Sequence, residues 1–498
     1  MPASLSQLAT GILCEVFLWQ SGVQIANITN AAQTMQGIGA SGAWWPLDVY
    51  NYPDTVRQNV SYLLFSNDTL GLTSYRYNVG GGGEGVGNPS RAPETMYVSS
   101  GVWNYSADPQ GSYFLRAAAQ YGVPQLTAFV NSAPPAFTTN GEACGGFLNN
   151  ASIPSFSTYL ADVVSYWKTQ GIDFAYVSPM NEPDNSFGPA NGSVACTQEG
   201  MAILPVARAP VVSALRSALD TAGLSSVLVQ ADETSTQIQF AVTSQFWLPG
   251  AASSLGAVSH HDYLFADDTA LQLMGEQGRQ LSGKQMWFTE ICCFVGAGES
   301  TDPAAALVYG QGYDPTMLSA LQMANLIYRA FTVTGDAHFD WWLALSSEIG
   351  CDPSSNASCA TSINDGGWND GLIYYDPSYY MNGNTALYLT KRYFVLKHFT
   401  HAIPIGAVRY EVSTFPSPFR LIAFKLPTGG WSIIALNLEP SEGLLALSTL
   451  DMGAATAAYQ TTTSEDWETL NTASALSCGT VFQMVLPGSS VTSIYFSE

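Results

Sequence analysis

The sequence predicts a (β/α)8 TIM barrel with a small all-β sandwich formed by the C-terminus and one or more N-terminal strands. Between residues 35 and 345, short β-rich runs alternate with helical patterns, as expected for parallel β/α units. After about residue 400 the pattern changes to strands separated by turns, with little helical period. The eight expected barrel strands lie at residues 35–40, 74–79, 125–131, 174–178, 227–231, 257–261, 285–289 and 338–345.

Three apolar stripes at helical spacing separate some of these strands. Gly122 and Gly171 each follow the end of one stripe, where glycine commonly terminates a helix. A doubly wound open sheet is the main alternative, but no glycine motif is placed to bind a dinucleotide. The stripes consist of Phe114, Ala117, Ala118 and Tyr121; Phe156, Leu160, Val163, Val164 and Trp167; and Met317, Leu321, Ala324, Tyr328 and Phe331.

We expect the barrel to span residues 35–400 and the sandwich to span 401–498, with residues 1–34 adding one or more strands to the sandwich. Residues 8–19 are mostly apolar, but no basic residue precedes them and no clear cleavage site follows. Residues 1–20 are therefore either a degenerate signal region or a strand. A disulfide between Cys14 and Cys478 would join the two ends of the sandwich.

The charge of the chain excludes several classes of partner. Lys and Arg number 16 against 39 Asp and Glu, so nucleic acid and anionic membranes would be repelled. No stretch reaches the roughly 18 apolar residues needed to span a bilayer. We expect a monomer whose partner is a neutral substrate, such as a polysaccharide or oligosaccharide.

The cysteines indicate disulfides and a secreted, extracellular protein. There are eight, with no CxxC pair, so disulfides are favoured over a metal site, and we expect no metal and no cofactor. Cys144 with Cys196 could join two rim loops, and Cys351 and Cys359 bracket a short loop. The adjacent Cys292 and Cys293 are a vicinal disulfide, two free thiols or partners of distant cysteines. Seven sequons also favour secretion and begin at Asn27, Asn59, Asn67, Asn104, Asn150, Asn191 and Asn356.

Two glutamates follow barrel strands, where the catalytic residues of such barrels lie. Glu182 stands in SPMNEPDNSFG (178–188), and Glu290 ends the apolar run WFTE (287–290). Glycoside hydrolysis needs such a pair, one carboxyl to protonate the leaving oxygen and, in a retaining enzyme, one to attack the anomeric carbon. The structural alternatives are a plain loop turn at Glu182 and a buried carboxylate satisfied by backbone donors at Glu290.

These segments resemble glycoside hydrolase family 30. The resemblance also covers GIGASGAWW (37–45), YRYNVGGGG (75–83), NSAPPAFTTNG (131–141), HHDY (260–263) and DWWLAL (340–345). It implies that Glu182 is the acid/base, Glu290 the nucleophile and Asn181 a ligand of the 2-hydroxyl at the cleavage point.

The resemblance assigns further residues to substrate binding. It implies that Arg76 supports the charge of the nucleophile, although a purely structural ion pair is the alternative. His261 and Tyr263 match a pair that contacts sugar and nucleophile, and Trp341 matches an aromatic floor of the first sugar subsite. Asn131 stands where some relatives carry Trp.

Two further residues are candidates for contacts with sugar. Glu84 follows the glycine run 80–83, where the backbone can approach a ligand closely. Trp45 is a candidate for a further subsite, as are Trp44, Trp342 and Trp368, although isolated aromatics are more often core.

Within the family, the chain looks most like the fungal endo-β-1,6-galactanases, which implies β-1,6-galactan side chains of arabinogalactan as substrate. The alternatives are another family 30 activity (β-1,6-glucanase, xylanase or β-glucosidase-like) and a non-catalytic carbohydrate-binding barrel, which would not need both carboxylates.

Overall fold

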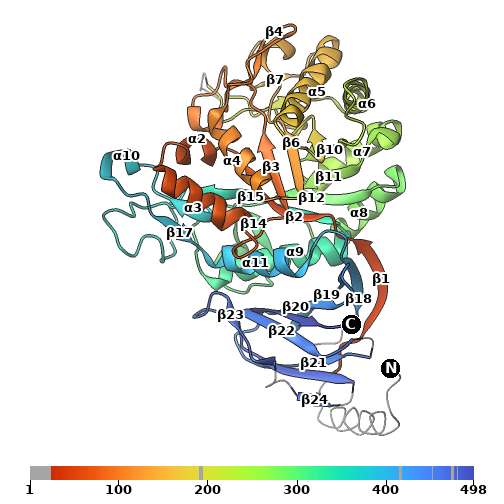
Figure 1. The fold of residues 1–498 in the computed structure, drawn as a ribbon, viewed down its shortest axis with the longest axis vertical. Helices are drawn as coiled ribbons and strands as arrows, with labels where there is room; N and C mark the ends of the chain where they lie inside the picture. The colour runs from red at the N-terminus through yellow and green to blue at the C-terminus, as the bar shows by residue number, and fades with distance from the viewer. Residues whose placement is uncertain (1–23, 190–194, 414–417, 451, 473–475, 479) are drawn as a thin grey trace.

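The computed structural model describes residues 24–189, 195–413, 418–450, 452–472, 476–478 and 480–498 (Figure 1). Eight parallel strands form a closed barrel, in which β12 pairs with β15 and β15 with β2. The predicted barrel is confirmed. Its strands are β2 (Gly37–Gly42), β3 (Ser74–Asn78), β6 (Gln125–Phe129), β8 (Tyr176–Ser178), β10 (Leu228–Thr234), β11 (Ala257–His261), β12 (Gln285–Glu290) and β15 (His338–Ser346).

A long helix follows each barrel strand and covers its outer side (Figure 1). In α5 the predicted stripe of Phe156, Leu160 and Trp167 is buried, so this face packs on the barrel. Asp108 accepts a hydrogen bond from the Gly111 N–H at 2.8 Å and caps the start of α4. These helices are α3 (Asp54–Phe65), α4 (Pro109–Gln120), α5 (Ile153–Thr169), α6 (Pro205–Thr221), α7 (Gln237–Ala251), α8 (Asp268–Ser282), α9 (Met317–Arg329) and α11 (Lys391–Ala402).

Short elements lie between the barrel strands and their helices. Two disulfides lie in this region. Cys144–Cys196 is the pair that the sequence suggested, and Cys351–Cys359 closes the short loop that these two cysteines bracket. The short elements are α2 (Trp45–Val49), β4 (Tyr97–Ser99), β5 (Val102–Trp103), β7 (Gly146–Phe147), β9 (Met201–Ala202), β13 (Phe294–Gly296), β14 (Leu307–Tyr309), β16 (Gly371–Tyr375), α10 (Tyr379–Asn382) and β17 (Leu387–Leu389).

Below the barrel in Figure 1, two antiparallel sheets form the β-sandwich. Strand β1 (Ile28–Thr34) pairs with β18 (Val408–Val412), so an N-terminal strand completes the larger sheet, as predicted. That sheet continues through β19 (Phe419–Lys425), β20 (Trp431–Asn437), β26 (Ser490–Phe496), β22 (Ala455–Thr461) and β23 (Glu468–Thr469). The smaller sheet contains β21 (Gly443–Ser448), β25 (Val481–Leu486) and β24 (Leu476–Cys478).

The larger sheet of the sandwich has two buried faces. Ile433 and Ile494 belong to the apolar core between the two sheets, whereas the neighbouring Ile434 and Leu436 join the core of the barrel side. This alternation is expected for a strand covered on both faces. Buried His398 on α11 reinforces the junction by hydrogen bonds to side chains of β22 and β26.

Two predictions fall outside the described residues: the nature of residues 1–20 and the bridge from Cys14 to Cys478. Within the described ranges, no helix is both long and apolar enough to cross a membrane.

Candidate active site

A pocket of about 500 Å³ opens where the barrel strands end. Glu182 follows β8 and Glu290 ends β12, so the fold brings to one site two carboxylates separated by more than 100 residues. Both side chains are almost completely buried. The lining residues are Trp44, Arg91, Glu182, Asn185, Phe187, Gln198, Ser235, Thr236, Tyr263, Glu290, Cys292, Cys293, Tyr309, Trp342, Glu348, Trp368 and Asp370.

Arg76, on β3, holds the Glu290 carboxylate. Its Nη1 lies 3.1 Å from Oε2 of Glu290 and donates at 2.9 Å to Oγ of Ser41. Its Nη2 donates at 3.4 Å to Oδ1 of Asn181. Since Oδ1 is the acceptor, the NH2 group of Asn181 is the end that remains to donate to a sugar hydroxyl. The guanidinium is fully buried, so the ion pair of Arg76 and Glu290 requires further hydrogen-bond partners. Ser41 and Asn181 provide them.

Tyr263 binds the other oxygen of the same carboxylate. Its hydroxyl donates to Oε1 of Glu290 at 2.9 Å. Glu290 is therefore fixed at both oxygens, by Arg76 at Oε2 and by Tyr263 at Oε1. Such orientation of an ionised carboxylate is what a nucleophile requires before it attacks.

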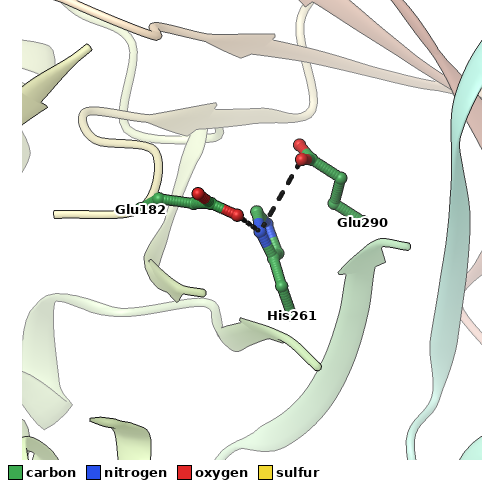
Figure 2. Close-up of side chains that lie close together, drawn as sticks. All are labelled: Glu182, His261 and Glu290. Atoms are coloured by element: carbon green, nitrogen blue, oxygen red, sulfur yellow. Dashed lines mark hydrogen bonds and ion pairs between the residues drawn. The ribbon is translucent and has the colours of Figure 1, made fainter. Parts of the chain in front are cut away.

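His261, at the end of β11, lies between the two glutamates (Figure 2). Its Nδ1 is 3.1 Å from Oε1 of Glu182 and 3.8 Å from Oε1 of Glu290, and its Nε2 is 3.0 Å from Oε2 of Glu233. Burial alone would lower the pKa of His261, but the three carboxylates outweigh burial and raise it to about 10. The imidazole is therefore protonated at neutral pH.

The carboxyl of Glu182 has a raised pKa. Burial raises the pKa of this carboxyl to about 7, and the hydrogen bond and positive charge of His261 only partly oppose the rise. Its backbone lies in the left-handed region at φ 43°, and its N–H donates to the carbonyl of Glu233 at 3.0 Å. Glu182 can thus carry a proton near neutral pH, as a general acid must.

Glu233 is a site residue that the sequence analysis missed. Its buried carboxylate contacts His261 and lies 3.6 Å from Nη2 of Arg76, and it accepts hydrogen bonds from Thr289 and, at 2.7 Å, from Gln230. Burial would raise the pKa of Glu233, but Arg76, His261 and Thr289 lower it to about 2. The available signal was an acidic pair, Asp232 and Glu233, directly after the mostly apolar run 227–231.

Seven predicted contacts are not among the residues that line this pocket. Three of them contact other site residues: Arg76 contacts Glu290, Asn181 contacts Arg76, and His261 contacts Glu182. Of the other four, two are tryptophans. Trp341 is fully buried, and its Nε1 donates to the carbonyl of Asp370 at 2.6 Å, whereas Trp342 lines the pocket. Trp45 packs against Phe114 with ring centroids 4.5 Å apart.

The other two are Glu84 and Asn131. Glu84 is exposed, and its backbone carbonyl accepts from the Ala143 N–H at 2.8 Å. Asn131 is buried, and its side-chain amide has no hydrogen-bond partner among the described residues. The structure therefore brings together Arg76, Asn181, Glu182, His261, Tyr263 and Glu290.

Glu182, His261 and Glu290 each offer one ligand atom, and these atoms lie within 4.8 Å of one another, close enough for a metal ion. The proton on His261 supplies a positive charge at that point, and a cation would have to displace it.

A family model described as O-glycosyl hydrolase family 30 matches residues 22–352. An endo-β-1,6-galactanase of Hypocrea rufa is 25% identical over 296 residues, covering 52% of this chain and 58% of that protein. The chain thus matches less than two thirds of the length of this relative.

Solved structures show the same fold over most of the chain. A conserved exported protein of Bacteroides fragilis matches with a TM-score of 0.77 at 18% identity, covering 95% of this chain and 100% of that one. The catalytic domain of a family 30 xylanase C from Talaromyces cellulolyticus matches with a TM-score of 0.70 at 20% identity, also covering 95% and 100%.

Proposed function

Because the chain belongs to glycoside hydrolase family 30, we propose that it is a retaining β-glycosidase with Glu290 as nucleophile and Glu182 as general acid/base. The observation that carries the proposal is the closeness of the two carboxylates. An oxygen of Glu182 and an oxygen of Glu290 lie within 4.8 Å of each other. Retaining enzymes hold the two groups about 5–5.5 Å apart, whereas inverting enzymes leave about 6.5–9.5 Å for a water molecule.

In the first step, Glu290 attacks the anomeric carbon while Glu182 gives its proton to the leaving oxygen. The C–O bond to the leaving group breaks, and a glycosyl ester forms on Glu290. His261 donates to Oε1 of Glu182 at 3.1 Å, so its positive charge stabilises the carboxylate that Glu182 becomes. Asn181 is placed beside Arg76 to bind the 2-hydroxyl of the sugar.

In the second step, the ionised Glu182 takes a proton from water, and the resulting hydroxide attacks the anomeric carbon. The ester bond breaks, Glu290 leaves as a carboxylate, and Glu182 is protonated again. Arg76 and Tyr263 then bind the two oxygens of the released Glu290. Two inversions at the same carbon retain the β configuration.

The substrate we propose is β-1,6-galactan, cleaved within the chain. Support comes from the name of the Hypocrea rufa relative and from a pocket whose walls carry flat aromatic faces suited to the C–H face of a pyranose. The formal charge of -23 fits a neutral polymer. The aromatic lining residues are Trp44, Phe187, Tyr263, Tyr309, Trp342 and Trp368.

We also propose that the protein acts outside the cell as a monomer. Three disulfides join described cysteines, which fits an oxidising compartment. The similarity in fold to an exported bacterial protein agrees with this location.

The test is digestion of a panel of β-1,6-galactan, β-1,6-glucan and β-1,4-xylan, with the first product anomer followed by NMR. We expect galactan to be cleaved fastest and the β-anomer to appear first. An α-anomer as first product would contradict retention, and faster cleavage of another polymer would replace galactan as substrate.

Two variants test the assigned residues with the same polymer. Glu182→Gln and Glu290→Gln should each lower kcat by about 10²-fold or more. The exposed Glu468 of the sandwich provides a matched control, and Glu468→Gln should keep wild-type activity. Full activity in either active-site variant would overturn the assignment of that residue.

A further inference from the structure

The disulfide between Cys292 and Cys293 lines the pocket but has no role in the proposed chemistry. Of the three states that the sequence left open, the structure has the vicinal bridge. The pair follows Glu290 by two and three residues. Cys293 keeps 8% of its surface exposed and Cys292 only 1%, so the bridge faces the pocket chiefly through Cys293.

The backbone at the bridge is held by the segments that carry two aromatic walls of the pocket. The N–H of Cys293 donates at 3.0 Å to the carbonyl of Asn369, the residue after Trp368. The carbonyl of Cys293 accepts at 2.9 Å from the N–H of Gly310, the residue after Tyr309. The ring centroids of Tyr309 and Trp368 are 5.6 Å apart. The bridge therefore lies where these two walls meet.

Cys293 occupies a backbone conformation that favours glycine. Its φ is 61°, in the left-handed region, where a side chain other than Asn or Asp is uncommon. Glycine would adopt this conformation without strain. The cysteine side chain therefore stands here against the backbone preference, which indicates a use for the sulfur itself.

The bridge begins beside the nucleophile. Sγ of Cys292 lies 4.0 Å from the hydroxyl of Tyr263, which binds Glu290. Glu182 comes from a different loop, and its neighbours Asn185 and Phe187 also line the pocket. Because Glu182 protonates the leaving group, we assign its loop to the leaving-group side of the pocket. We assign the loop of the nucleophile, which carries the bridge, to the side of the non-reducing sugars.

We propose that the Cys292–Cys293 disulfide is a sugar-binding surface for the second sugar on the non-reducing side of the cleaved bond. A disulfide presents polarisable sulfur and no thiol proton, so it can pack against the apolar C–H face of a neutral pyranose. Because the bridge is covalently closed, it is already ordered before the ligand binds. This inference rests on the proposed glycosidase function and names a subsite of that function.

The test compares two substrates that differ by this one sugar. These are an aryl β-monoglycoside and the matching aryl β-diglycoside, taken from whichever of the galacto, gluco and xylo series the wild-type protein hydrolyses fastest. Cys292→Ser/Cys293→Ser removes the bridge with little change in volume. Cys292→Ala/Cys293→Gly removes the bridge and puts glycine at position 293, where the left-handed backbone favours it. Cys351→Ser/Cys359→Ser removes a disulfide that does not line the pocket and serves as the control.

We expect both pocket variants to raise KM for the diglycoside about three- to tenfold, while KM and kcat for the monoglycoside change less than about twofold. The control variant should change neither KM nor kcat for either substrate. An unchanged KM for the diglycoside would overturn the inference. Equal losses with both substrates would overturn it too, since the bridge would then only position Glu290. If the wild type hydrolysed no substrate in any series, the proposed function itself would fail.

Discussion

Glu233 contacts two buried positive groups of the active site, Arg76 and His261. Arg76, His261 and Thr289 lower the pKa of Glu233, whereas burial raises the pKa of Glu182, so Glu182 is the one of these two carboxyls that keeps a proton near neutral pH. Glu233 lies behind His261 and does not line the pocket, so it is a positioning residue. Its charge determines how His261 and Arg76 are held.

Replacing Glu233 by Gln should therefore alter activity without removing a reacting group. The loss of one carboxylate lowers the pKa of His261, and a cation left partly unpaired destabilises the fold by about 3 kcal/mol. A misplaced Arg76 or His261 should lower kcat by about 10²-fold. NMR titration measures the pKa of His261, steady-state kinetics measures kcat, and urea unfolding measures the free energy of unfolding.

Glu468→Gln, far from the pocket, is the matched control. A Glu233→Gln protein that loses activity but keeps the wild-type pKa of His261 would contradict this role for Glu233.

The pH dependence of kcat/KM follows from Glu182. Its pKa is raised to about 7, so the acid form needed in the first step predominates below that pH. Activity should therefore fall as the pH rises through about 7, by about tenfold per pH unit. With an aryl glycoside whose leaving group needs no proton, kcat/KM should not fall as the pH rises through about 7. If that substrate showed the same alkaline loss, a different group would be titrating.

At the scale of elements, β15 decides which tryptophan faces the substrate. Successive side chains of a strand point to opposite sides, so Trp341 and Trp342 cannot both line the pocket. The structure turns Trp342 toward it, where its ring meets Trp44 edge-on at 5.0 Å. The sequence could not determine which of the two tryptophans points to the pocket, because both faces of the strand are buried and apolar residues stand on both.

Two conservative variants separate these tryptophans. Trp342→Phe should raise KM for an oligosaccharide about three- to tenfold. Trp341→Phe should leave KM within about twofold and lower the free energy of unfolding by about 1–3 kcal/mol, since it loses the donation to Asp370 and some packing. Steady-state kinetics and urea unfolding measure both. The reverse pattern would place Trp341, not Trp342, at the sugar.

Strand β10 explains why Glu233 escaped prediction. The apolar run indicates a strand that ends at Ala231, whereas the strand continues to Thr234. Polar residues can extend a strand when buried partners satisfy them, as Arg208 does for Asp232 at 2.5 Å and Arg76 and His261 do for Glu233. Arg208 comes from helix α6, and Arg76 and His261 come from other strands, so only the assembled barrel reveals these partners.

At the scale of the whole molecule, the alternation of strands and helices was enough to predict the barrel, because each unit is local in sequence. Glu182 and Glu290 were predictable for the same reason, since each follows a strand. The grouping of Tyr309, Trp368 and the vicinal disulfide was not predictable, because two separate connections, β12 to α9 and β15 to α11, meet there.

The junction of barrel and sandwich gives a prediction about acid stability. His398 is fully buried, and its ring nitrogens lie 2.9 Å from Oγ of Ser493 and 3.0 Å from Oγ1 of Thr461. Burial, with His401 and Lys397 nearby, lowers its pKa to about 3. The unfolded chain binds this proton near pH 6.5, so stability should be lost as the pH falls from about 6.5 toward 3.

Urea unfolding at pH 7 and pH 4.5 measures this loss. His398→Gln removes the titrating group, so its loss of unfolding free energy between the two values should be about 2–3 kcal/mol smaller than that of the wild type. His401 titrates in both proteins and cancels in the comparison. Equal losses in the two proteins would show that His398 does not control the junction.

The central claim is a covalent intermediate on Glu290, and trapping it is the most direct measurement. A 2-deoxy-2-fluoro-β-glycoside with a good leaving group slows the second step, so the ester should accumulate. Mass spectrometry of the digested protein is predicted to find one added fluoroglycosyl group on the peptide that contains Glu290. The same label on any other residue, or unlabelled protein that hydrolyses the compound with inversion, would contradict the account.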